Sequence, residues 1–172
     1  SSSSMSSQEI GVGRIPSDAV DEYDYIHLRH SRAEPIITVD ETNRRSRLLL
    51  TNESDLERIE ITEEVNGSTA AKELLETTDF TTDSVILHQR TIEECYLLHI
   101  QYVVARPDQY RIQFCQVLRD ANVQCRANVS VMQATLIRIP VAYDERPSSS
   151  GSGRRSTCYD PPETLPEIGV IQ

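Results

Sequence analysis

The chain has 172 residues, a formal net charge of −10 and 38% hydrophobic residues, which suits one modest domain with polar flanks. Its basic runs carry no interleaved aromatic residues, so we expect no nucleic-acid partner. No apolar run approaches the roughly 20 residues of a membrane span, and we expect membrane contact only through a further segment of a longer precursor.

Residues 1–55 are predicted to form a flexible, polar and acidic tail or linker. Residues 1–20 are rich in serine and offer little to bury. Two short apolar runs, at 34–39 and 46–51, have the composition of strands, and turn-forming residues separate them. The charged residues around these runs leave their place in a core open.

The domain itself is predicted over residues 56–160. A weak alternation of apolar and charged residues at 56–61 suits a half-exposed strand, and Asn66-Gly67 marks a turn. Residues 69–76 have the composition of a helix. The domain therefore opens with a strand, a turn and a helical segment.

Two strands are predicted more strongly, at 83–90 and 95–104. The second alternates between an apolar face and a mixed face, as a strand in a half-buried sheet does. The apolar face consists of Tyr96, Leu98, Ile100 and Tyr102.

A helix is predicted after Pro107, which breaks the preceding strand and suits a first helical turn. The apolar residues behind it recur at helical spacing; they are Tyr110, Phe114, Val117, Leu118 and Ala121. Residues 129–141 return to strand character. Serine and glycine dominate residues 145–155, which are predicted to be a disordered loop, and residues 161–172 are expected to be a C-terminal extension.

Cysteines and glycosylation sequons indicate an oxidising compartment, either the lumen of the secretory pathway or the extracellular space. No cysteine has the spacing of a zinc ligand; the four are Cys95, Cys115, Cys125 and Cys158. The sequon asparagines are Asn52, Asn66 and Asn128. We expect a secreted glycoprotein with one or two disulfides, whose parent chain carries a signal peptide or a membrane anchor.

The sequence carries no catalytic signature. His27 and His30 could share a helical face but have no third ligand nearby, and His88 and His99 have no nucleophile partner. No phosphate-binding loop, nucleophile elbow or paired-carboxylate pattern is present. We therefore expect no enzymatic activity, no metal and no cofactor.

Basic runs occur in three segments that are predicted to be loops: Arg29–Arg32, Arg44–Arg47 and Arg154–Arg155. Exposed loops are where proteases cut, so a processing protease is one expected partner. The alternative is that these arginines are solvated charges without a partner.

One set of residues resembles the BRICHOS family of proprotein domains. Asp79-Phe80 precedes Cys95-Tyr96 by sixteen positions, an apolar strand continues from Tyr96, and Cys158 lies at the distance of the family's second cysteine. In layout the chain is similar to the BRICHOS domains of the lung surfactant protein C precursor, the integral membrane precursors and annelid antimicrobial-peptide precursors.

The resemblance implies an α+β fold, with an antiparallel sheet of four to five strands flanked by two α-helices. It implies a Cys95–Cys158 disulfide, and it favours extended chain at 69–76, against the helical composition there. Cys115 and Cys125 are additional to the family pair, and either they form a second disulfide or they are two buried thiols.

The resemblance also implies a function: an intramolecular, anti-amyloid chaperone that shields an aggregation-prone β-segment of its own proprotein until proteolysis releases it. The client could be an antimicrobial peptide, and the domain could form a homo-oligomer. The client would bind the apolar strand face described above, formed by Tyr96, Leu98, Ile100 and Tyr102. The alternative is that this face is core beneath a helix.

Asp79 is the remaining residue that the resemblance marks. A buried carboxylate without a cationic partner has a raised pKa, and its protonation would make the domain sensitive to pH. The alternative is an exposed aspartate that caps a turn. Two other functions stay open: an extracellular, disulfide-stapled protein-recognition domain without chaperone activity, and a secreted protease inhibitor.

Overall fold

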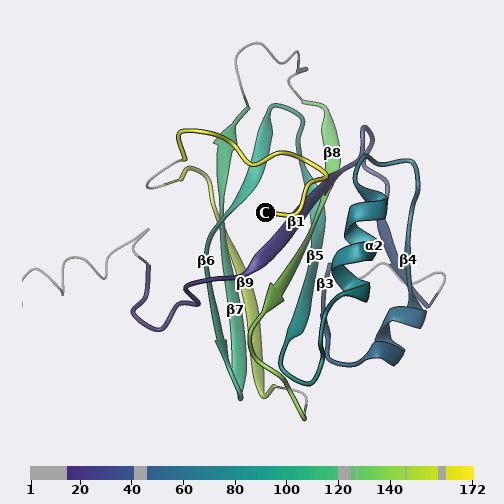
Figure 1. The fold of residues 1–172 in the computed structure, drawn as a ribbon. Helices are drawn as coiled ribbons and strands as arrows, with labels where there is room; N and C mark the ends of the chain where they lie inside the picture. Colours follow the sequence, from purple (N-terminus) through teal and green to yellow (C-terminus); the bar gives the residue numbers. More distant parts are fainter. Residues whose placement is uncertain (1–14, 41–45, 120–124, 127, 146, 159–161) are drawn as a thin grey trace, which may run out of the picture.

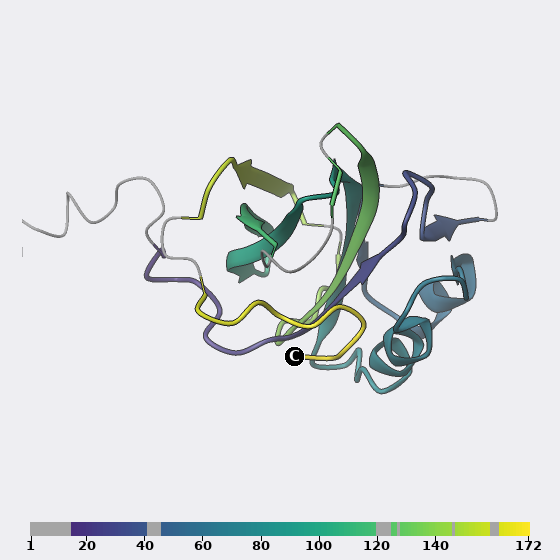
Figure 2. The same ribbon diagram turned by 90° about the horizontal axis from the view of Figure 1, so that it is seen from above.

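The structure is a computed structural model that describes residues 15–40, 46–119, 125–126, 128–145, 147–158 and 162–172. Its elements form three layers (Figure 1, Figure 2). A four-stranded sheet lies in the middle, with a three-stranded sheet on one side and a helix with a two-stranded ribbon on the other.

The central sheet is antiparallel throughout, with the order β1-β8-β5-β3. Its strands are β1 (Asp24–Arg29), β3 (Arg47–Leu50), β5 (Ser84–Glu93) and β8 (Ser130–Ile139). Because the side chains of successive residues in a strand point to opposite faces, those of β5 are buried in two separate cores. Val85 and Leu87 enter the core beneath the helix, whereas Ile86 and Ile92 enter the core between the two sheets.

The second sheet has the order β6-β7-β9. Its strands are β6 (Tyr96–Arg106), β7 (Gln109–Leu118) and β9 (Ser149–Arg155). β6 and β7 form an antiparallel hairpin closed by Pro107 and Asp108, and β9 runs parallel to β7. The predictions of a helix after Pro107 and of a disordered loop over 145–155 were therefore wrong.

The segment after Pro107 is a strand because Tyr110, Ile112 and Phe114 alternate into the core between the sheets. β9 has almost no apolar surface of its own. It is held instead by its ladder with β7 and by a disulfide at Cys158, just beyond its end.

The third layer covers the other face of the central sheet. Its elements are β2 (Ile37–Val39), the 3-10 helix η1 (Glu53–Arg58), β4 (Ile59–Ile61) and α2 (Ser68–Glu76). The helical prediction for 69–76 and the short strands predicted at 34–39 and 46–51 are confirmed, as α2, β2 and β3. The expected flexible tail is wrong where β1 forms. The mixed α+β class is confirmed, but the described part holds one α-helix and one 3-10 helix instead of two α-helices.

The C-terminal segment packs between α2 and β1. Gly67, at the start of α2, has a positive φ of 93°, and a Cβ atom there would lie 2.2 Å from the Cα of Gly169. From this contact the chain runs along β1, where the Gly169 N–H donates to the His27 carbonyl (2.7 Å) and the Gln172 N–H to the Tyr25 carbonyl (2.8 Å). The outer edge of β1 is therefore covered.

Candidate functional site

Both disulfides differ from the expected pairs: Cys95 bonds to Cys125 and Cys115 bonds to Cys158. The Cys95–Cys158 bond that the resemblance implied is therefore wrong. Both alternatives for Cys115 and Cys125, a bond to each other or two buried thiols, are wrong as well. The strand register explains the difference, because Cys115 lies opposite His99 and beside the last residue of β9. Cys158 follows β9 and so reaches Cys115 on the neighbouring strand β7, while Cys95 precedes β6, on the side of β7 away from β9. Two disulfides are typical of a protein outside the cytosol.

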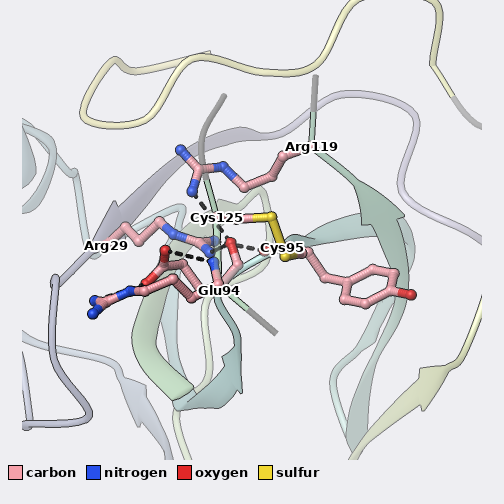
Figure 3. Close-up of a disulfide and its surroundings, with 7 residues drawn as sticks. Arg29, Glu94, Cys95, Arg119 and Cys125 are labelled. Atoms are coloured by element: carbon pink, nitrogen blue, oxygen red, sulfur yellow. Dashed lines mark hydrogen bonds and ion pairs between the residues drawn. A yellow bond between two sulfur atoms is a disulfide. The ribbon is translucent and has the colours of Figure 1, made fainter. Parts of the chain in front are cut away.

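Arginines surround the Cys95–Cys125 disulfide (Figure 3). The Arg29 guanidinium donates to the carbonyls of Glu94 and Tyr96, both at 2.7 Å, and Arg119 donates to the Glu94 carbonyl at 3.2 Å. Burial, followed by the charge of Arg119, lowers the pKa of Arg29 to about 10. Because Arg29 bonds to backbone on the neighbouring sheet, this group joins β1 to the start of β6.

The expected client face is buried. Leu98 and Ile100 are 1% and 4% exposed and lie in the core between the sheets, and Tyr96 packs against that core. The face is therefore core, and the element that covers it is a sheet and not a helix. Tyr102 is half-buried. An accessible apolar face is absent from this strand.

The edge of β6 is closed as well. The Gln133 side chain accepts the Leu98 N–H (3.0 Å) and donates to the Leu98 carbonyl (2.8 Å). Further along, the Val20 N–H donates to the Val103 carbonyl at 2.7 Å. A client strand could not pair with β6 without displacing these groups.

Asp79 is an exposed turn residue. Its carboxylate accepts the backbone N–H of Thr81 at 3.0 Å and the hydroxyl of Thr81 at 2.6 Å. These hydrogen bonds lower the pKa of Asp79, so the expected buried carboxylate with a raised pKa was wrong. The sequon residues Asn52, Asn66 and Asn128 are exposed, and their glycosylation stays a prediction.

His30 lies beside Glu34 and Glu64, a grouping that could suggest a metal site. The backbone N–H of Arg32 donates to His30 Nδ1 at 3.0 Å. The ring proton of neutral His30 must therefore be on Nε2, which donates to Glu64 at 3.1 Å. Since Nε2 has no free lone pair in this tautomer, the geometry is that of a hydrogen-bonded imidazole.

The outer edge of β9 remains open. The Ser149 N–H donates to the Asp108 carbonyl, so in a parallel ladder Ser149 and every second residue after it bond to β7. The backbone N–H and C=O groups of Ser150, Ser152 and Arg154 consequently point away from the sheet. Within the described residues no hydrogen bond reaches these backbone groups. We call them the open edge.

Three arginines lie beside the open edge: Arg47 on β3, Arg90 on β5 and Arg154 on β9. We call these three residues the arginine cluster. Arg47 donates to the hydroxyls of Ser152 (3.2 Å) and Ser150 (3.4 Å). In the part of the chain that the structure describes, none of the three has a carboxylate partner.

His88 lies beneath the arginine cluster. Its ring packs on Phe114, with centroids 4.4 Å apart, and Phe114 is level with Arg154 while His88 is level with Arg47. Burial, and then the charges of Arg90, Arg47 and Arg154, lower the pKa of His88 to about 4. The arginine cluster is thus a local positive surface, and the neutral ring of His88 beneath it adds no charge to that surface.

Sequence reasoning missed the open edge and treated Arg47 and Arg154 only as cleavage sites or solvated charges. A signal was present: residues 146–159 contain no acidic residue, although the chain contains 27. Predicting the site also required knowing that 149–155 is an edge strand and that β3 lies beside it.

Among the described helices, none is long and apolar enough to cross a bilayer. No protein-family model matches the chain, and neither curated proteins nor solved structures gave a significant match.

Proposed function

We propose that this chain is an extracellular, disulfide-stapled protein-recognition domain, and that the open edge of β9 with the arginine cluster is its binding surface. The observation that carries the proposal is the contrast between edges. β1 and β6 are covered by other parts of the chain, whereas the outward groups of β9, and those of the shorter strand β3 beside it, have no hydrogen-bond partner within the described residues. Unpaired strand edges attract further strands, and natural proteins usually protect them.

The disulfide that follows β9 supports this role. Cys115–Cys158 joins β7 to the segment that follows β9, so an edge strand made of serine, glycine and arginine is held in place at its far end. A rigid edge loses little conformational freedom on binding, which favours affinity.

The chaperone function stays a prediction, but its two structural expectations, the Cys95–Cys158 staple and the accessible client face, are absent here. Fibrillation assays with several unrelated β-prone peptides separate the two functions. A recognition domain leaves most of these peptides unaffected at equimolar concentration, whereas a chaperone delays several of them.

The binding surface is tested by selecting random peptides displayed on phage against the oxidised domain. We expect selected peptides to lose binding to Ser152→Pro, because proline has no N–H at the centre of the open edge. Ser152→Ala is the matched control, since it removes the hydroxyl and keeps the N–H. If the selected peptides bind the proline variant as well as the wild type, the open edge is not the recognition surface.

A further inference from the structure

We propose that the partner is an extended acidic segment of another protein, which adds to β9 as a further strand and pairs its carboxylates with the arginine cluster. This inference rests on the proposed function and names its ligand. Strand addition supplies the backbone hydrogen bonds, and alternate side chains of the added strand supply specificity.

The dimensions of the open edge define the length of the segment. Three outward residues, Ser150, Ser152 and Arg154, are spaced two residues apart, which is about 6.6 Å per step in a strand. A partner segment of roughly five residues would satisfy their outward groups. Ser150 and Ser152 have small side chains, so a neighbouring strand can approach along this stretch without steric conflict.

The charge of the site selects the chemistry of the partner. Arg47, Arg90 and Arg154 form no ion pair within the described residues. Paired guanidinium and carboxylate groups form strong, directional hydrogen bonds. An acidic side chain on the inner face of the added strand would therefore find its partner already in position.

The two ends of the site differ. Near Arg47 and Ser150 lies a hollow of about 450 Å³ that Tyr110 and Tyr143 also line, together with acidic residues such as Asp144. Near Arg154 lies a hollow of about 540 Å³ that includes Tyr96 and Gln116, and it has one acidic lining residue, Glu93, against three in the first hollow. We therefore expect the carboxylates of the partner near Arg154 and Arg90, and an apolar side chain near Tyr143.

Two other occupants fit less well. A second copy pairing through β9 would bring two arginine clusters together, and like charges on adjacent strands are destabilising. A long polyanion would lie against the rest of a surface whose net charge is −10, whereas a short segment touches the arginine cluster alone.

The test is fluorescence anisotropy with a labelled seven-residue peptide of alternating valine and glutamate, its valine-lysine counterpart, and dextran sulfate. We expect the glutamate peptide to bind and the lysine peptide to fail. Arg154→Glu should weaken binding of the glutamate peptide at least tenfold and should allow the lysine peptide to bind. Lys72→Glu is the matched control, because Lys72 lies on α2, on the far side of the central sheet from β9 (Figure 2), and this change alters net charge equally.

Backbone pairing is measured on the unmodified protein by amide hydrogen exchange. The glutamate peptide should protect the amides of Ser150, Ser152 and Arg154 against exchange. Binding without this protection, or equal competition by dextran sulfate, would show a general anion surface and overturn strand addition. If phage-selected peptides require the N–H of Ser152 but the glutamate peptide does not bind, the acidic partner is wrong and the recognition function stands. If neither kind of peptide uses the open edge, both proposals fail.

Discussion

Buried histidines should make the domain sensitive to mild acid. His27 is fully buried, and its Nδ1 lies 2.8 Å from the hydroxyl of Thr135. Burial, followed by the nearby His99, lowers the pKa of His27 to about 3. His88 is buried beneath the arginine cluster, with its pKa lowered to about 4. Both rings are therefore neutral in the folded protein at mildly acidic pH.

The direction of the effect follows from the unfolded chain, in which both histidines regain a pKa near 6.5. Between that value and the folded pKa, unfolding takes up one proton per histidine, so stability is full above pH 6.5 and falls as the pH drops. Each proton contributes about 1.4 kcal/mol per pH unit. From pH 6.5 to about 5 the two histidines together remove about 3 kcal/mol, less than the full slope would give, because each histidine of the unfolded chain is only half protonated at pH 6.5. This is a large part of the roughly 5–15 kcal/mol of a typical domain.

The assay is urea unfolding between pH 5 and 8, followed by circular dichroism or tyrosine fluorescence. His88→Phe and His27→Leu should each reduce the pH slope of the unfolding free energy by somewhat less than half, because burial also lowers the pKa of His99, which adds a share of its own. Thr135→Val is the matched control: it removes the same hydrogen bond to His27 and lowers stability, but it leaves the titrating ring and the slope in place. An unchanged slope in the His27→Leu, His88→Phe double variant would refute the reasoning.

Three further changes have outcomes that the structure predicts. Replacing either disulfide, Cys95–Cys125 or Cys115–Cys158, by two serines opens a loop of 30 or 43 residues and should lower the free energy of unfolding by about 4 kcal/mol in urea titrations; no loss would mean that the bond does not form. Gln133→Leu leaves the backbone groups of Leu98 without partners and should lower the free energy of unfolding by about 1–3 kcal/mol for each group. Urea titrations measure this loss as well, and an unchanged free energy would contradict the prediction. Gly67→Ala forces a side chain into the C-terminal segment at positive φ, so hydrogen exchange at the segment's amides should rise, and unchanged exchange would show that the two backbones are not in contact.

Much of the fold could be predicted where the pattern of apolar residues fitted a strand or a helix but not both. The strands containing Val85–Leu87 and Leu97–Val104 follow from apolar runs and alternation, and α2 follows from composition. The segment after Pro107 could not be assigned this way. Tyr110 and Phe114 are four residues apart, which suits a helical turn and also one face of a strand, and only pairing with β6 decides between the two.

Most of the other wrong predictions concern features that depend on contacts between residues far apart in the sequence. Ser149–Arg155 has the composition of a loop, and its strand exists because β7 pairs with it and a disulfide follows it. Four cysteines allow three pairings, and spacing alone cannot choose among them. Asp79 was assigned from the resemblance, and its environment here is a local turn with Thr81.

The two disulfides interlock in sequence, because each loop contains one cysteine of the other. A chain that emerges from its N-terminus exposes Cys95, Cys115 and Cys125 before Cys158. Once the β6–β7 hairpin forms, Cys95 and Cys115 are separated by about four residues of strand, roughly 13 Å, which is too far for a disulfide. Once Cys95 has bonded to Cys125, Cys115 therefore remains a thiol until Cys158 arrives. Maturation should depend on late oxidation or on a disulfide isomerase, and chains that end before Cys158 would carry a thiol by which a cell's quality control could retain them.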